Sequence, residues 1–134
     1  MRKLILLGTA ILAAVAVAVP LGLASTKAAK VAVTLKEFKV TPSTASVKAG
    51  KVTFAVKNAG ALAHEFVIVK TSLAAAKLPV KNNVVTLKPL AKVGPFKPGK
   101  GGTLSLSLKA GKYVLYCNVK GHYSFGQRIA FTVK

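Results

Sequence analysis

Hydrophobic and polar residues alternate with a period of two in several parts of the chain. The clearest segments are residues 31–35, 52–57 and 104–109. A period of two places successive side chains on opposite faces, so these segments predict half-buried strands of an antiparallel sheet. Denser apolar runs over residues 64–69 and 113–117 predict more fully buried strands, and residues 129–133 predict the last one.

Turn-forming residues separate the predicted strands. Gly, Pro, Asn and Ser gather in residues 41–43, 49–51, 58–60, 98–102 and 110–112. These residue types favour tight turns, because Gly and Asn tolerate positive φ angles and Pro fixes its own φ. Short strands with regular turns predict an all-β fold, either a β-sandwich or a small barrel. Residues 71–77 predict one short helix, and residues 80–94 show no clear pattern.

The N-terminal segment differs from the rest of the chain. Arg2 and Lys3 precede an apolar run over residues 4–23, which ends in small residues. This pattern predicts a secretory signal with cleavage after Ala24, which leaves residues 25–134 as one exported domain. The run has about the 20 residues that a membrane-spanning helix needs, so an uncleaved anchor is the alternative. In either case the domain is predicted to lie outside the cytoplasmic membrane.

The chain is strongly basic, with 21 Lys and Arg against two acidic residues and a formal charge of +19 in 134 residues. Most lysines fall at turns or at solvent-facing strand positions, which predicts a Lys-coated surface. Such a surface favours acidic or anionic partners and, through mutual repulsion, a monomer. We expect no nucleic-acid partner, because no helix-turn-helix pattern or basic stripe with interleaved aromatics is present. The 52% hydrophobic content argues against a disordered basic protein.

Few side chains are available for catalysis or metal binding. Glu37 and Glu65 are the only acidic residues, which argues against enzymes that use paired carboxylates. Cys117 is the only cysteine, so an intrachain disulfide and any four-cysteine cluster are excluded. His64 and His122 are too few for an all-histidine zinc site. The composition therefore does not predict an enzyme.

The remaining reactive residues fall at the ends of predicted strands. Cys117 ends one strand, His122 follows after four residues, and Gln127 follows after four more, just before the last strand. His64 opens another strand after the turn over residues 58–63. A sandwich can bring these strand ends to one pole. A thiolate with two imidazoles suits copper or zinc, and three such ligands with a weak fourth are typical of blue-copper electron-transfer sites.

The spacing C-x4-H-x4-Q, with a histidine after an upstream Asn-Gly turn, resembles the cupredoxins, small type 1 copper proteins of the plastocyanin and azurin group. The resemblance covers about residues 30–134. It implies a Greek-key antiparallel β-sandwich and a single copper ion. It also implies that His64, Cys117 and His122 bind that ion.

The fourth ligand position departs from the usual pattern of this family. Most members have Met there, whereas Met1 is the only methionine in this chain and lies in the predicted export signal. Gln127 occupies the position, as glutamine does in phytocyanins of the stellacyanin type, so the resemblance implies a weak axial glutamine ligand. An amide oxygen is a harder donor than a thioether and favours Cu(II), so we expect a lower reduction potential than with Met.

The resemblance implies a one-electron carrier that exchanges electrons with a partner protein through the exposed edge of His122. We expect an apolar rim around that edge, formed by Ala61, Leu62, Ala63, Gly121 and Phe125. Lys120 would favour a redox partner that is acidic or anionic at its docking rim. Membrane association is expected only if the N-terminal segment is not cleaved.

Two other functions stay open at the level of sequence. A protein that stores or delivers copper in the cell envelope would use the same ligands. A metal-free structural domain of this fold would not need the ligand trio. The sequence also leaves open whether copper or zinc fills the site.

Overall fold

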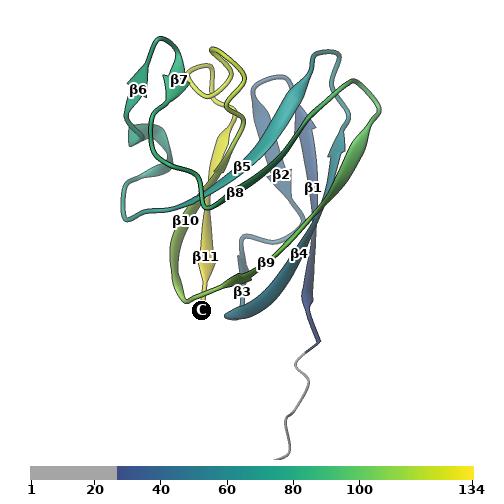
Figure 1. Cartoon of the computed structure of the whole chain (residues 1–134), viewed down its shortest axis with the longest axis vertical. Coiled ribbons are helices and arrows are strands. Elements are labelled where there is room, and N and C mark those ends of the chain that lie inside the picture. The colour runs from purple at the N-terminus through teal and green to yellow at the C-terminus, as the bar shows by residue number, and fades with distance from the viewer. Residues whose placement is uncertain (1–26) are drawn as a thin grey trace, which may run out of the picture.

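Two β-sheets pack against each other in the computed structural model, which describes residues 27–134 (Figure 1). The first sheet has the order β2-β1-β4-β9, formed by β1 (Ala29–Lys36), β2 (Lys39–Pro42), β4 (Gly50–Asn58) and β9 (Gly101–Leu108). The second has the order β3-β11-β10-β5-β8, formed by β3 (Ser46–Val47), β5 (His64–Lys70), β8 (Ala91–Phe96), β10 (Gly111–Tyr116) and β11 (Arg128–Val133). The predicted signal over residues 1–24 and its cleavage site lie outside the described residues.

The predicted all-β sandwich is confirmed, and both of its sheets are mixed rather than purely antiparallel. Strand β1 runs parallel to β4, and β3 runs parallel to β11. The other pairs in the two sheets are antiparallel. Two parallel neighbours cannot be joined by a tight hairpin, because the chain must first return to the end at which the first strand began. The chain makes this return between β1 and β4 through the intervening β2 and β3.

The period of two seen in the sequence corresponds to the sandwich core. Along β1 and β4, alternate side chains are buried, and the residues between them are mostly exposed. Phe54 of β4 packs against Phe66 and Phe131 of the other sheet, with ring centroids 5.2 and 5.8 Å away. Burial of such aromatic pairs joins the two sheets without a disulfide.

The segment between β5 and β8 is where the sequence prediction was least accurate. The helix predicted over residues 71–77 is reduced to a short 3₁₀ turn, η1 (Ala75–Lys77), with no side-chain cap at its start. The Tyr123 hydroxyl donates to the carbonyl of Ala75 at 2.6 Å and accepts from the Leu78 N–H at 2.9 Å, so tertiary contacts fix this segment. Within residues 27–134, no helix is long and apolar enough to cross a membrane.

A small hairpin follows η1, in the stretch that showed no sequence pattern. It consists of β6 (Val80–Lys81) and β7 (Val84–Val85), joined by Asn82 and Asn83 at φ 51° and 62°. Two central residues with positive φ are typical of the tight hairpin turns that Asn favours.

The strand pairing explains why the candidate residues meet at one end of the sandwich. Strand β10 lies between β5 and β11 and is antiparallel to both. The C-terminal end of β10 therefore lies beside the start of β5 and the start of β11. Cys117 directly follows β10, Gln127 directly precedes β11, and His64 is the first residue of β5.

Candidate metal centre

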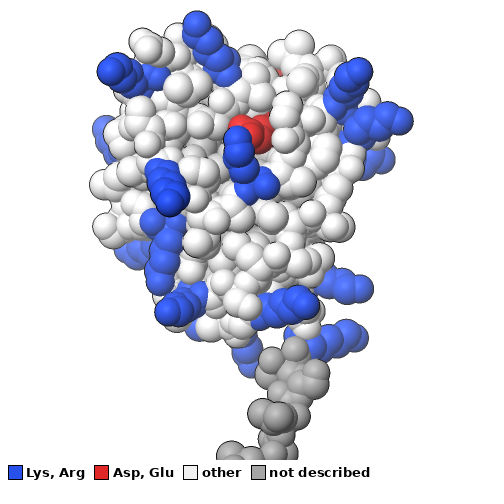
Figure 2. Space-filling model, viewed as in Figure 1, with Lys and Arg blue, Asp and Glu red and all other residues white. Residues whose placement is uncertain are grey.

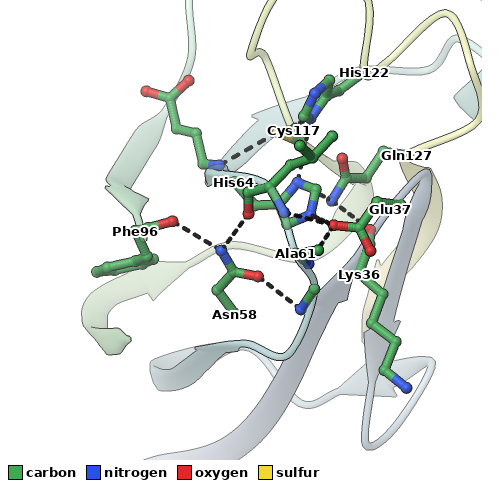
Figure 3. Close-up of polar contacts among 12 residues, drawn as sticks. Lys36, Glu37, Asn58, Ala61, His64, Phe96, Cys117, His122 and Gln127 are labelled. Atoms are coloured by element: carbon green, nitrogen blue, oxygen red, sulfur yellow. Dashed lines mark hydrogen bonds and ion pairs between the residues drawn. The ribbon is translucent and has the colours of Figure 1, made fainter. Parts of the chain in front are cut away.

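Three buried donors converge at this end of the sandwich. The ligand atoms of His64, Cys117 and His122 all lie within 4.8 Å of one another (Figure 3). His64 Nδ1 lies 3.2 Å from His122 Nδ1, and Cys117 Sγ lies 3.5 Å from the same nitrogen. Each of the three residues is buried. The structure therefore brings together the trio that the sequence singled out.

The separations between these donors fit a single metal ion. Nitrogen and sulfur atoms bind zinc at about 2.0–2.1 and 2.3 Å, and at tetrahedral angles this places two nitrogens about 3.3 Å apart. The same geometry places a nitrogen and a sulfur about 3.5 Å apart. The observed 3.2 and 3.5 Å match both values. Neutral imidazoles and a soft thiolate favour copper or zinc over harder cations.

Burial controls the protonation of two of these groups. It raises the pKa of the Cys117 thiol, although hydrogen bonds from the N–H groups of Glu65 and Val119 act in the opposite direction. It also lowers the pKa of His122, and the nearby His64 lowers it further. Both effects favour the neutral imidazole, which is the form that binds a metal. Binding of a metal to Cys117 would release the thiol proton.

Backbone hydrogen bonds fix the loop that carries Cys117 and His122. The Cys117 N–H donates to the Gln127 carbonyl at 3.0 Å, and the Gln127 N–H donates to the His122 carbonyl at 3.1 Å. The Asn118 side chain pairs with both backbone groups of Val85 in β7, at 2.7 and 3.2 Å. The small hairpin thereby supports the loop from outside, so the donors are held before any metal binds.

Gln127, which the motif spacing predicts as the fourth ligand, lies beside His64. Its Nε2 lies 3.0 Å from His64 Nδ1 and donates to the Lys36 carbonyl at 2.9 Å. The residue is fully buried, and its Oε1 has no hydrogen-bond partner among the described residues. A buried oxygen without a partner is costly, and a metal ion beside the trio would satisfy it.

Two polar side chains, Asn58 and Glu37, lie at the turn before His64, and the sequence analysis did not predict the position of Glu37. Asn58 accepts from the Gly60 N–H at 2.9 Å and donates to the Leu62 carbonyl at 2.7 Å, which folds the turn before β5. Glu37 was missed because it belongs to the distant turn between β1 and β2. Its Oε1 lies 3.2 Å from His64 Nε2 (Figure 3). Hydrogen bonds, foremost from the Leu62 N–H, lower the pKa of Glu37 to about 2.

An exposed apolar surface surrounds the metal centre. Leu62 and Phe125, two of the predicted rim residues, are 48% and 71% exposed. Phe38 also belongs to this surface and was missed by the sequence analysis. Its ring meets the edge of His122 at a centroid distance of 5.9 Å and lies 5.1 Å from Phe125. Phe38 thus extends the exposed surface beyond the predicted rim residues, whereas Gly121, which was predicted to belong to the rim, is buried.

A family model described as a cupredoxin-like domain matches residues 5–130. The chain belongs to the cupredoxin family. Family membership confirms the resemblance drawn from the C-x4-H-x4-Q spacing. Among curated protein sequences, no significant match was found.

Solved structures share the cupredoxin fold at low sequence identity. Reduced auracyanin from the photosynthetic bacterium Roseiflexus castenholzii is 21% identical, with a TM-score of 0.61, and the match covers 80% of this chain and 98% of that one. Reduced rusticyanin is 22% identical, with a TM-score of 0.57 and 81% of each chain covered. Another rusticyanin structure, described as that of a copper protein, is 21% identical, with a TM-score of 0.57 and 81% and 80% covered. In this cupredoxin, His64, Cys117 and His122 are arranged for a single copper ion.

Proposed function

We propose that this cupredoxin is an exported type 1 copper protein that carries one electron at a time between partner proteins. The observation that carries the proposal is the convergence of three buried donors at distances that fit one ion. Gln127 is proposed as the weak axial ligand through its unpartnered Oε1. A bound copper ion would supply the exchange between Cu(II) and Cu(I).

The chain's own residues supply a rigid and largely dry setting. Because the loop that holds Cys117 and His122 is tied to Gln127 and to β7, little rearrangement is needed when the ion changes its charge. Burial of the donors excludes water from the ion. Two of the similar structures are of reduced proteins, and a third is of a copper protein, which supports redox chemistry in this fold.

The exposed apolar surface offers a place for a redox partner to dock. His122 is 9% exposed and lies beside Phe38, whose ring also contacts Phe125. A partner that covers this surface would exclude water and approach the metal ligand closely. We place this activity outside the cytoplasmic membrane, on the basis of the N-terminal export pattern over residues 1–24.

The proposed function is tested by the visible spectrum of the purified protein. After addition of Cu(II), we expect an intense blue or green band that bleaches with ascorbate and returns on oxidation. The band reports charge transfer between Cys117 and Cu(II). A folded protein without this band would contradict the proposal. If the band forms but Cu(I) is rapidly lost to an acceptor protein, the function is copper delivery and not electron transfer.

Electron exchange with anionic partners should depend strongly on salt. The described residues carry a large excess of basic side chains, and Figure 2 shows Lys and Arg at many separate places on the visible face. Electrostatic steering accelerates association by about 10- to 1,000-fold at low salt and is screened at physiological ionic strength. We expect the rate of oxidation by ferricyanide to fall steeply between low and physiological salt, which stopped-flow absorbance would measure.

Lys120, next to His122, should contribute more to this salt dependence than a distant lysine. Lys120→Gln is expected to weaken it, whereas Lys51→Gln removes the same charge at the far end of β4 and is the matched control. Rates that do not vary with salt, or equal effects of the two variants, would argue against steering toward the His122 edge.

A further inference from the structure

The turn between β1 and β2 places a carboxylate against the metal centre. Glu37 Oε1 accepts hydrogen bonds from the N–H groups of Ala61 and Leu62 at 2.6 and 2.8 Å, and it lies 3.2 Å from His64 Nε2 (Figure 3). One oxygen therefore binds both the loop before β5 and the outer nitrogen of a fully buried histidine.

Contacts on both sides of the His64 ring assign the same tautomer. A carboxylate can only accept, so the Nε2 that faces Glu37 carries the proton. On the other side of the ring, the amide Nε2 of Gln127 can only donate, and it lies 3.0 Å from His64 Nδ1. Nδ1 is therefore the unprotonated nitrogen, and in the metal-free protein its lone pair accepts from Gln127. This is also the nitrogen that lies 3.2 Å from His122 Nδ1 and faces the metal centre.

The close approach of Glu37 to His64 depends on a glycine. A Cβ at Gly60 would overlap Glu37 Oε1 and would lie 2.8 Å from His64 Nε2. Any other residue at position 60 would therefore force the Glu37 carboxylate or the His64 imidazole to shift. The turn before β5 is thus shaped for this contact, in addition to its own closure by Asn58.

Glu37 also differs electrostatically from the other acidic residue. The Glu65 carboxylate forms an ion pair with Lys92 at 3.1 Å, which offsets its charge. The described ion pairs give Glu37 no lysine or arginine partner; its contacts are with two amides and His64. Its negative charge therefore acts on the imidazole. Carboxylates that accept from a ligating histidine hold its tautomer and raise the basicity of its metal-binding nitrogen.

We propose that Glu37 is a positioning residue that fixes His64 with Nδ1 toward the metal and, through its charge, favours Cu(II) over Cu(I). This inference rests on the proposed copper site. In a redox site, the same charge that improves the donor nitrogen also stabilises the more positive oxidation state. Glu37 thus sets the reduction potential from outside the ligand trio.

The test is the variant Glu37→Gln, which keeps an oxygen that can accept from Ala61 and Leu62 and removes only the charge. Removing such an outer partner typically changes metal affinity by about 10- to 100-fold. We expect the Cu(II)/Cu(I) affinity ratio to fall about tenfold, which raises the potential by about 59 mV for a one-electron couple. Voltammetry of the copper-loaded protein measures this shift.

A matched control separates the local effect from net charge. Ala110→Lys makes the same +1 change at an exposed turn position beyond β9, at the end of β10 opposite Cys117. Its potential should stay close to that of the wild type. Equal reduction potentials for Glu37→Gln and Ala110→Lys would overturn the proposal. That result would mean that the Glu37 charge has no local effect on the ion and that the residue only holds the loop.

Nitrogen-15 NMR of the metal-free protein gives a readout that does not require copper. We expect His64 to carry its proton on Nε2 in the wild type, and this tautomer to lose population in Glu37→Gln. Gly60→Ala, which displaces the carboxylate without changing charge, should have the same effect. A wild-type His64 protonated on Nδ1 would overturn the proposal. If copper gave no visible band at all, the proposed function would fail, and the NMR result would still decide the Glu37 contact.

Discussion

Replacing Cys117 with serine is expected to abolish the visible band of the copper-loaded protein and to weaken Cu(II) binding by more than about 100-fold, the upper range for residues that only support a ligand. A serine hydroxyl is not ionised at neutral pH and provides no thiolate for charge transfer. The fold should persist, because the serine oxygen can still accept from the Glu65 N–H that now donates to Sγ at 3.3 Å. Absorbance and a copper titration measure the two losses.

The control for this variant keeps one thiol in the chain. In Cys117→Ser/Ser107→Cys, the cysteine lies at an exposed position of β9, away from the metal centre. This protein should also lack the band, because a thiol far from His64 and His122 cannot complete the site. Circular dichroism should show that both variants are folded without metal. Thermal unfolding should show that the buried hydroxyl lowers the free energy of unfolding by about 1–2 kcal/mol. A band that survives in Cys117→Ser would contradict the assignment of the thiolate.

The metal centre was predictable because its residues lie at strand ends. The period of two located the strands at whose ends Cys117 and His64 lie. Because β10 pairs antiparallel with β5 and β11, these strand ends meet at one end of the sandwich. His122 and Gln127 follow Cys117 at short spacings, so the loop that joins them has few possible conformations. Local sequence thus determined both the chemistry and its place in the fold.

Other features depend on contacts that no local pattern encodes. Glu37 lies 27 positions from His64 in the sequence, and only the parallel pairing of β1 with β4 brings its turn beside the loop before β5. Phe38 joins the apolar surface for the same reason, since it follows Glu37 in that turn. The alanines of residues 74–76 predicted a helix from propensity, whereas packing against Tyr123 limits the segment to a single turn. Tertiary contacts outweigh propensity in such short segments.

These missed residues bear directly on how the site would work. The trio alone indicates a copper protein, but its redox properties depend on what surrounds the donors. Glu37 acts on His64 from one side, and Gln127 contacts the same imidazole from the other. The negative charge of Glu37 and a bond from the unpartnered Gln127 amide oxygen to the ion would both favour Cu(II), so we expect this cupredoxin to be a comparatively weak oxidant.

Replacing Gln127 with methionine is therefore expected to raise the reduction potential by more than about 59 mV, a tenfold shift toward Cu(I). A thioether is a softer donor than an amide oxygen and stabilises Cu(I). Methionine has nearly the length of glutamine, so the buried space at this position accommodates it. The variant loses the hydrogen bond to the Lys36 carbonyl, whereas Oε1 has no partner to lose among the described residues. Voltammetry of both proteins at one pH gives the comparison.

Gln127→Leu is the matched control, because it removes the same hydrogen bond to Lys36 and provides no axial donor. If the Gln127 oxygen stabilises Cu(II), the wild type should have the lowest potential of the three proteins. Equal potentials for the wild type and Gln127→Leu would mean that the oxygen does not act on the ion. A fall or no change in the potential of Gln127→Met would contradict the axial role of Gln127, because a soft sulfur in contact with copper must favour the reduced state.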